Sequence, residues 1–286
     1  MRTTKTSESA GKPVDTASPR VSVVIPTYNE ARNLPAVFAE LPPVHEVIVV
    51  DGRSVDDTVA VAQSLRPDVR IVLQNRKGKG NALACGFAAV TGDIVVMLDA
   101  DGSADPAEIE RYVAALVDGA DFAKGTRFAA GGGSSDLTRV RRLGNKALNG
   151  LVNAVYGTRY TDLCYGYNAF WSHCLPVLDL RVDTERGSGT DMVWGDGFEV
   201  ETLINVRIAK AGLRVDEVGS FERDRVHGES NLNAVSDGLR VLRTIIVERR
   251  RAQGTHVAPA VVDLRDEHRI ISLAPATADV SGAGGT

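Results

Sequence analysis

The sequence predicts an α/β fold in a single domain, with helices on both faces of a mostly parallel sheet. Short runs rich in Val and Ile alternate with segments of helical periodicity between residues 21 and 124. The runs are apolar throughout, which is typical of parallel strands buried on both faces. Polar residues follow three of these runs, and sheets of this kind bind ligands at the carboxyl ends of their strands.

The predicted elements follow one another in a regular order. Strands are predicted over residues 21–25, 46–50, 69–73, 93–98 and 120–124. A first helix opens at Asn29 and Glu30, a second runs to Leu65 with Ser54 or Asp56 as its cap, and two more cover residues 81–90 and 107–117. Strands that alternate with helices in this way form βαβ units, whose strands are parallel.

The flanks differ in composition from the centre. We predict a disordered tail over residues 1–20, a folded domain over 21–232, a basic amphipathic helix over 233–252, and a flexible tail over 253–286 in which 269–273 can add a strand. The first tail lacks the apolar segment of a secretory signal, and no run reaches the ~20 apolar residues that span a bilayer. We therefore expect a cytoplasmic protein, which is compatible with peripheral contact at the inner face of the cell membrane.

Charge and cysteine content exclude other classes. The formal net charge of -4 argues against a nucleic-acid-binding protein, which would usually be basic. Cys85, Cys164 and Cys174 lack the C-x-x-C spacing of a zinc or redox site. We expect them to be reduced, structural residues.

Two carboxylates follow the predicted strand 93–98. Asp99 and Asp101 can share one side of an extended segment and hold a hard divalent cation, Mg²⁺ or Mn²⁺. Such a cation would also bind a diphosphate and neutralise charge on a leaving group. The alternative is a turn in which Ser103 and Asp105 precede and cap the next helix. The position directly after a buried strand favours the metal site.

Two earlier segments suit a nucleotide. Asp51 ends the second strand and can accept hydrogen bonds from a base or a ribose, or it is a turn residue before Gly52. The glycines of residues 76–81 let the backbone approach an anion at a helix start, without matching a Walker loop or G-x-G-x-x-G. A solvated basic turn explains that segment equally well.

Charged residues in the second half offer further candidates. The basic ones are Arg127, Arg139, Arg141, Arg142 and Lys146, which can bind phosphates or form a solvated helix face. Asp196, Glu199 and Glu201 open another helix, where acids are stabilising in any case and where one can be a catalytic base. Residues 222–231 are too polar for a core strand and predict a mobile loop. His227 in this loop is a metal ligand or an ordinary hydrogen-bonding residue.

The ordered motifs resemble family 2 glycosyltransferases of the GT-A fold, which has a mostly parallel, Rossmann-like sheet. These motifs are residues 23–30, 50–58, 78–82, 92–93 and 99–101. Later segments resemble the dolichyl-phosphate and polyprenyl-phosphate mannosyltransferase branch, namely residues 125–127, 141–145, 196–199 and 225–230. The chain departs from that branch at Ser103, where Gln is common, at Gly52, where a second acid is common, in its long polar insert 183–194, and in lacking a transmembrane hairpin. These departures bear on the lipid acceptor.

The resemblance implies roles for individual residues. Pro26, Tyr28, Glu30 and Asp51 would line the nucleotide pocket, and Asp99 and Asp101 would hold the metal. The phosphate and donor contacts would be Lys79, Arg127, Arg141, Arg142, Arg225 and Ser230. Asp101, Arg127 and Glu199 would be the catalytic residues, and residues 222–231 a lid on the acceptor side.

The function expected from these motifs is metal-dependent transfer of a hexose, with inversion, from a GDP-mannose or UDP-glucose type donor to polyprenyl phosphate. A phosphate acceptor is already anionic and needs no strong base, whereas a hydroxyl acceptor would use Glu199, Asp196 or Glu201. A nucleotide-dependent oxidoreductase is disfavoured because G-x-G-x-x-G is missing after the first strand. A catalytically silent nucleotide-sugar-binding protein is the alternative of another class.

The segment 234–251 predicts an amphipathic helix. Its apolar stripe consists of Val235, Leu239, Leu242 and Ile246, widened by Val241 and Ile245. Its basic residues are Arg240, Arg243, Arg249, Arg250 and Arg251. The stripe can pack on the domain while the arginine end contacts an anionic membrane surface, so we expect weak peripheral binding.

Overall fold

The computed structural model describes residues 18–135, 137–182, 192–228, 234–251 and 270–271. Ser230, most of both predicted tails and most of the 183–194 insert lie outside the described residues. The limits assigned to the tails are therefore still predictions.

The predicted sheet is confirmed. Eight strands follow the order β10-β3-β2-β1-β4-β7-β5-β8. They are β1 (Val21–Thr27), β2 (Glu46–Asp51), β3 (Arg70–Leu73), β4 (Ile94–Met97), β5 (Phe122–Thr126), β7 (Asn168–Trp171), β8 (Val215–Gly219) and β10 (Ile270–Ile271). Only β7 runs antiparallel to its neighbours in this described sheet. A separate pair joins β6 (Gly133–Ser134) to β9 (Phe221–Glu222).

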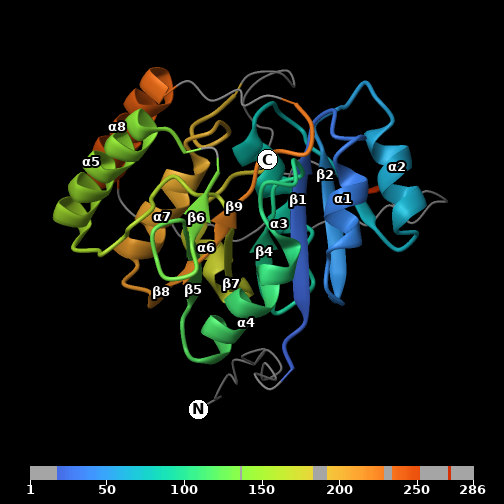
Figure 1. The fold of residues 1–286 in the computed structure, drawn as a ribbon, viewed down its shortest axis with the longest axis horizontal. Coiled ribbons are helices and arrows are strands. Elements are labelled where there is room, and N and C mark those ends of the chain that lie inside the picture. The colour runs from blue at the N-terminus through green and yellow to red at the C-terminus, as the bar shows by residue number, and fades with distance from the viewer. Residues whose placement is uncertain (1–17, 136, 183–191, 229–233, 252–269, 272–286) are drawn as a thin grey trace, which may run out of the picture.

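Helices surround the sheet. They are α1 (Leu34–Ala39), α2 (Thr58–Leu65), α3 (Lys79–Ala88), α4 (Ile109–Val117), α5 (Arg139–Tyr156), α6 (Leu175–Leu178), α7 (Val200–Lys210) and α8 (Ala234–Arg250), with short 3₁₀ turns at Pro106–Glu108 and Ser172–Cys174. Figure 1 shows α1 and α2 at one end of the molecule and α5 beside α8 at the other. The helix α3 packs on β1, β2 and β3, and α4 packs on β5, β7 and β8.

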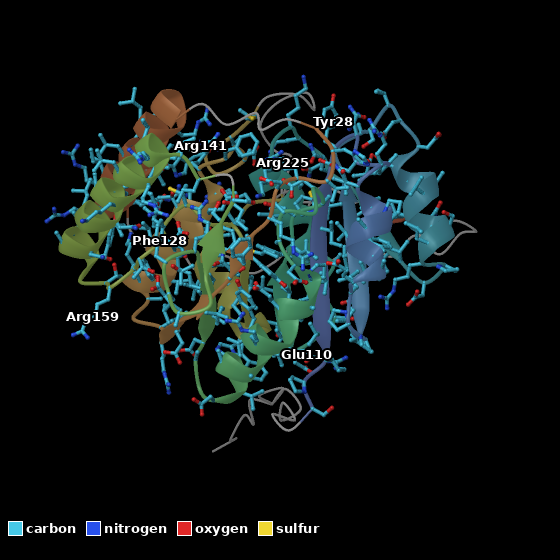
Figure 2. All side chains as sticks on the ribbon, in the orientation of Figure 1. Tyr28, Glu110, Phe128, Arg141, Arg159 and Arg225 are labelled. Atoms are coloured by element: carbon cyan, nitrogen blue, oxygen red, sulfur yellow. The ribbon has the colours of Figure 1, made fainter. Side chains whose placement is uncertain are left out.

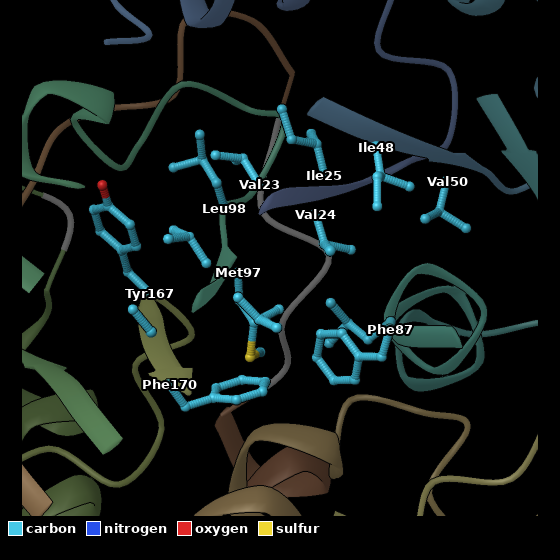
Figure 3. Close-up of a cluster of buried hydrophobic side chains, with 14 of the residues drawn as sticks. Val23, Val24, Ile25, Ile48, Val50, Phe87, Met97, Leu98, Tyr167 and Phe170 are labelled. Atoms are coloured by element: carbon cyan, nitrogen blue, oxygen red, sulfur yellow. The ribbon is translucent and has the colours of Figure 1, made fainter. Parts of the chain in front are cut away.

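The core lies on both sides of the central strand β1. Val23, Val24 and Ile25 have no exposed surface, as expected for an apolar run with neighbours on both faces. Phe87 of α3 meets Phe170 of β7 edge-to-face, with ring centroids 5.5 Å apart, as Figure 3 shows beneath the β1 side chains. This packing fixes the strand ends that carry the polar residues.

The first helix begins later than predicted. Asn29 has a φ of 58°, which is incompatible with a helix, and α1 starts only at Leu34, with Pro35 in its first turn. The residues between them form a turn beside the cavity described below.

The predicted apolar stripe of α8 is confirmed at Val241 and Ile245 and wrong at Leu239 and Ile246. Leu239 and Ile246 are 62% and 47% exposed, whereas Val241 and Ile245 are buried. Thr244 and Glu248 complete the buried face of the described helix. Because two of the buried positions are polar, apolar periodicity alone identified only part of the buried face.

Candidate active site

A cavity of about 930 Å³ opens at the carboxyl ends of the strands. One wall comes from the segments after β1, β2, β3 and β4, and the other from α5, α8 and the segment after β9. Tyr28, Arg225 and Arg141 all line it, and Figure 2 shows them along one edge of the molecule, while Glu110 lies at the opposite edge. The sequence prediction that the polar motifs meet at one sheet edge is therefore confirmed.

The segments after β1 and β2 are joined by hydrogen bonds. The amide of Asn29 donates to Ser54 Oγ at 2.9 Å, and Asn29 Oδ1 accepts from the Val55 amide at 2.8 Å. Asn29 and Arg53 both have left-handed φ values, 58° and 65°. Strained backbone of this kind persists where surrounding contacts hold it. The result is a fixed position for Tyr28, whose side chain is 61% exposed in the cavity wall.

Pro26 and Glu30 also line the cavity, but Asp51 lies behind its wall. Asp51 is 3% exposed, and its Oδ2 accepts a hydrogen bond from the Ser54 amide at 3.0 Å. Its Oδ1 is buried and has no hydrogen-bond partner among the described residues. Burial is the main cause that raises the pKa of Glu30, which accepts a hydrogen bond from Asn33.

The two carboxylates after β4 both line the cavity, and each is paired with a cation. Lys79 Nζ lies 2.7 Å from Asp99 Oδ1, and Arg225 Nε lies 3.3 Å from Asp101 Oδ2. Asp101 Oδ1 also accepts from the amide and hydroxyl of Ser103. Lys79 is shared with Glu201 at 2.7 Å. Burial lowers the pKa of Lys79, but Asp99 and Glu201 outweigh it and raise that pKa above its usual range.

The donor set fits a hard divalent cation that a diphosphate helps to bind. Two carboxylates supply oxygen ligands, and Mg²⁺ usually takes its remaining ligands from water and substrate phosphates. No cluster of three His, Cys, Asp or Glu side chains suited to a metal occurs in the part of the chain that the structure describes. His227 therefore stays outside any such cluster, and its Nδ1 lies 3.4 Å from an Arg32 nitrogen.

The glycine segment at the start of α3 packs closely against the loop that contains Asp196. The Asp196 carbonyl accepts from the amides of Gly80 and Asn81, at 2.7 and 3.3 Å. A Cβ at Gly78 or Gly80 would overlap the backbone of residues 195–196. These glycines are needed for that close approach, which occupies two of the amides at the helix start, whereas Lys77, Gly78 and Lys79 still line the cavity.

Arg127 is held by two carboxylates. It pairs with Asp162, with Nε to Oδ2 at 2.7 Å, and with Glu222 at 3.0 Å. Its guanidinium also lies over the Tyr165 ring, 5.1 Å from the centroid. Arg127 does line the cavity, but these contacts engage its donors with the protein. They favour an anchoring role over the predicted phosphate contact.

The predicted base Glu199 does not reach the cavity. Its Oε1 accepts from the amides of Gly195 and Gly197, so its carboxylate turns back on its own loop. Asp196 is also engaged, because Arg76 binds it with Nε at 2.7 Å. Of the three acids named from the sequence, Glu201 alone lines the cavity.

The two neighbouring arginines of α5 diverge. Arg141 lines the cavity, whereas Arg142 lies over the Phe128 ring, 5.8 Å from its centroid.

The sequence analysis did not identify Gln74, which follows β3, lines the cavity and is 8% exposed. Asp51 and Asp99 were identified because ligands bind at the carboxyl ends of parallel strands, and the same reasoning applies to Gln74.

A mostly parallel sheet with an aromatic-walled cavity and two acidic residues at its strand ends defines a GT-A glycosyltransferase. Residues 22–174 match the model of the family "Glycosyl transferase family 2", which is more than half of the chain. The chain therefore belongs to glycosyltransferase family 2 and is a glycosyltransferase.

Named relatives agree with this assignment. An uncharacterized glycosyltransferase of Mycobacterium tuberculosis H37Rv is 33% identical over 217 residues, covering 76% of this chain and 91% of the relative. The polyprenol monophosphomannose synthase of Mycolicibacterium smegmatis is 34% identical, covering 68% and 80%. Among solved structures, the glucosyl-3-phosphoglycerate synthase of M. tuberculosis has a TM-score of 0.62 at 25% identity, covering 82% and 81%.

Proposed function

We propose that this enzyme transfers a hexose, with inversion, from a nucleotide diphosphate sugar to polyprenyl phosphate. The observation that carries the proposal is the pairing of the acids in the cavity wall. Asp99 and Glu201 share Lys79, Asp101 faces Arg225, and Glu222 faces Arg127.

A carboxylate whose oxygen atoms are held by Lys or Arg is not free to take a proton from a hydroxyl acceptor. A hydroxyl acceptor would need such a base, whereas an acceptor phosphate is already ionised. Among the described residues, Glu30 is the one cavity acid that forms no salt bridge, and it lies in the segment after β1, close to Tyr28. The pairing pattern therefore favours an anionic acceptor.

The charge of the cavity supports the same substrates. Nine basic and five acidic side chains line it, so the wall carries a formal excess of positive charge. Positive clefts concentrate anionic ligands, and both a diphosphate donor and a phosphate acceptor are anions. Asp99 and Asp101 would hold a Mg²⁺ or Mn²⁺ ion, which when bound would neutralise charge on the leaving diphosphate.

The relatives bear on donor and acceptor in different ways. A polyprenol monophosphomannose synthase is 34% identical to this chain, and an undecaprenyl-phosphate mannosyltransferase is 31% identical. The synthase with the similar fold has been solved with Mn²⁺, uridine diphosphate and phosphoglyceric acid. Transfer to the hydroxyl of a small molecule, with Glu201 as the base, is therefore the second candidate. For both candidates, the donor is a sugar of the GDP-mannose or UDP-glucose type.

We further propose peripheral contact with the cytoplasmic face of the cell membrane. Val140 and Leu143 on α5 and Leu239 on α8 are all more than half exposed, and Val140 also lines the cavity. Within the described residues, no helix is both long and apolar enough to cross a membrane. An acceptor with a polyprenyl chain would reach the cavity from a membrane surface.

A transfer assay tests the proposal. The full chain is incubated with labelled UDP-glucose or GDP-mannose and Mn²⁺, and with polyprenyl phosphate, polyprenol or 3-phosphoglycerate. We expect label in the lipid phosphate alone. Label in 3-phosphoglycerate but not in polyprenyl phosphate would establish the second candidate, and binding of donor without any transfer would favour a silent binding protein.

A further inference from the structure

The buried carboxylate of Glu248, which lies outside the cavity, connects α8 to α7 and to the loop before α7. Glu248 is 1% exposed and does not line the cavity. It accepts a hydrogen bond from the indole nitrogen of Trp194 at 2.9 Å and two from Arg207, both at 3.1 Å. Arg243, five residues earlier in α8, lies over the Trp194 ring, 5.5 Å from its centroid. The loop before α7, the helix α7 and the helix α8 therefore meet at Glu248.

One route runs from Glu248 through Trp194 to α3. Trp194 lies in the turn closed by the Asp196 amide, which donates to the Val193 carbonyl at 3.0 Å. The carbonyl of Asp196 then accepts from Gly80 at 2.7 Å, and so fixes the first turn of α3. Lys79 is the first residue of that helix.

A second route runs through Arg207 along α7. Arg207 and Glu201 belong to the same helix, and Glu201 lies 2.7 Å from Lys79 Nζ. Both routes therefore end at Lys79, which in turn holds Asp99 at 2.7 Å. Gly166 faces this contact, since a Cβ there would lie 3.3 Å from both Lys79 Nζ and Glu201 Oε1. The position of Lys79 is set by two elements that Glu248 ties together.

We infer that Glu248 and Trp194 are positioning residues, which couple the α8 wall of the cavity to the donor and metal site. Gly238, Arg240 and Val241 place α8 in the cavity wall, so the same helix contacts the cavity and orients Lys79 and Asp99 from behind. This inference rests on the proposed donor site. By linkage, a ligand that shifts α8 changes donor affinity, and the donor changes the affinity of that ligand by the same factor.

The test uses two mild variants and two controls. Glu248→Gln keeps the shape of the side chain but weakens its contact with Arg207, and Trp194→Phe removes only the indole donor. Ile245→Val is the matched control, because Ile245 is 1% exposed on the same helix but its side chain is apolar and separate from the two routes. Arg249→Gln controls for a charge change at an exposed neighbouring position.

Calorimetry with UDP and with GDP, each with Mn²⁺, is run well below the melting temperature of every variant. Both test variants should bind the preferred nucleotide at least tenfold more weakly, while both controls bind it as the unmodified protein does. Equal affinity in all four variants, or an equal loss in Ile245→Val, would show that Glu248 and Trp194 only stabilise the fold.

Hydrogen exchange gives a readout that does not depend on the donor. The amides of Gly80 and Asn81 should exchange faster in Glu248→Gln and Trp194→Phe than in Ile245→Val, because both donate to Asp196. Unchanged exchange there would overturn the inference even if no nucleotide bound. If the unmodified protein bound neither UDP nor GDP but exchange rose as expected, the proposed function would fail and the coupling would stand.

Discussion

Arg127 and Asp162 form a bidentate ion pair, with Nε 2.7 Å from Oδ2 and a terminal nitrogen 2.8 Å from Oδ1. Asp162 has no exposed surface, and Asn145 also donates to its Oδ1 at 2.9 Å. The remaining terminal nitrogen of Arg127 reaches Glu222 on β9. The next residue, Arg223, donates its amide to the Ser103 carbonyl at 2.8 Å. Arg127 thus anchors the segment that covers the acidic pair.

We predict that Arg127→Lys and Asp162→Asn have similar effects. A lysine cannot reproduce the planar fork that binds Asp162, so each variant should lose roughly 1–3 kcal/mol of stability and most of its turnover. The double variant should be little worse than either single one, because both remove the same interaction. Denaturant unfolding and initial rates measure this. If Arg127 acted by direct phosphate contact, Asp162→Asn would keep its turnover while Arg127→Lys lost it.

The sheet and the location of the cavity were predictable because they follow from local pattern. Tyr28, Asp99 and Asp101 come directly after apolar strands, and parallel strand ends meet at one edge whatever the rest of the chain does. The roles of Arg127 and of the glycine segment were not predictable. Asp162 lies 35 residues from Arg127, and no sequence rule indicates that the Asp196 carbonyl fills the start of α3.

The choice between Glu199 and Glu201 shows a second limit. The two residues lie at the start of one helix, and which of them faces the cavity depends on where that helix begins. Glu199 is the residue before α7 and bonds its own loop, whereas Glu201 lies in the first turn. Predicted helix boundaries are ordinarily uncertain by one or two residues. Here an error of that size changes which of the two side chains is expected to face the cavity.

The metal prediction concerns Asp101. Asp101→Asn keeps the shape of the side chain and its hydrogen bond from Ser103 but removes the charge, so we expect an intact fold without turnover. Nucleotide and Mn²⁺ at about 100 times Kd should stabilise the unmodified protein by about 2.7 kcal/mol and the variant far less.

A thermal-shift series with and without chelator measures this stabilisation. Asp68→Asn, on an exposed ion pair, is the control. Full turnover of Asp101→Asn, or turnover unaffected by chelator, would remove the metal role.

The donor prediction concerns Gln74. Its side chain has no hydrogen-bond partner in the described part of the chain, although it lines the cavity and is mostly buried. A Cβ on Gly52 would lie 3.3 Å from the Tyr28 ring and 3.4 Å from Gln74 Oε1, so both side chains lie next to Gly52 in the cavity wall. A free amide there suits the edge of a nucleobase.

Replacing Gln74 with Met retains its length and removes its polar atoms. We expect about tenfold weaker binding of the donor nucleotide, equivalent to one lost hydrogen bond, and unchanged affinity for the acceptor. Calorimetry with the isolated nucleoside diphosphate and with inorganic pyrophosphate separates base from phosphate contacts. An equal loss for pyrophosphate would show that Gln74 does not contact the base.

The pH prediction concerns Glu46, which lies at the opposite end of β2 from Asp51. Burial raises the pKa of Glu46, but hydrogen bonds from Ser22, Thr91 and Arg70 outweigh it and leave that pKa below its usual range. A lowered folded-state pKa gives stability that is present above the unfolded pKa, about 4.3, and is lost as pH falls through the folded value.

Glu46→Gln should therefore be less stable than the unmodified protein by about 1–3 kcal/mol at pH 7. The difference should shrink as the pH falls from about 4.3, where the unfolded carboxyl group takes up its proton, to the lower folded-state pKa, below which the native carboxylate is neutral as well. Urea unfolding at several pH values measures it. A difference that stayed constant down to pH 3 would assign the effect to packing instead of charge.

The last prediction concerns membrane contact by α8. Arg249 and Arg250 are exposed, whereas Arg251 is partly buried and lies 3.5 Å from Asp179, so it is left unchanged. Changing Arg249 and Arg250 to Glu should weaken binding to anionic liposomes roughly 30-fold or more, since each basic residue near such a surface contributes about 1 kcal/mol. Changing Arg159 and Arg214 to Glu is the charge-matched control, because both residues are exposed and lie outside α8. Cosedimentation at low salt should fall when the salt is raised, because screening shortens the reach of surface charges. Recovery of no protein at low salt, or an equal loss in the control, would exclude α8 as the membrane-contacting element.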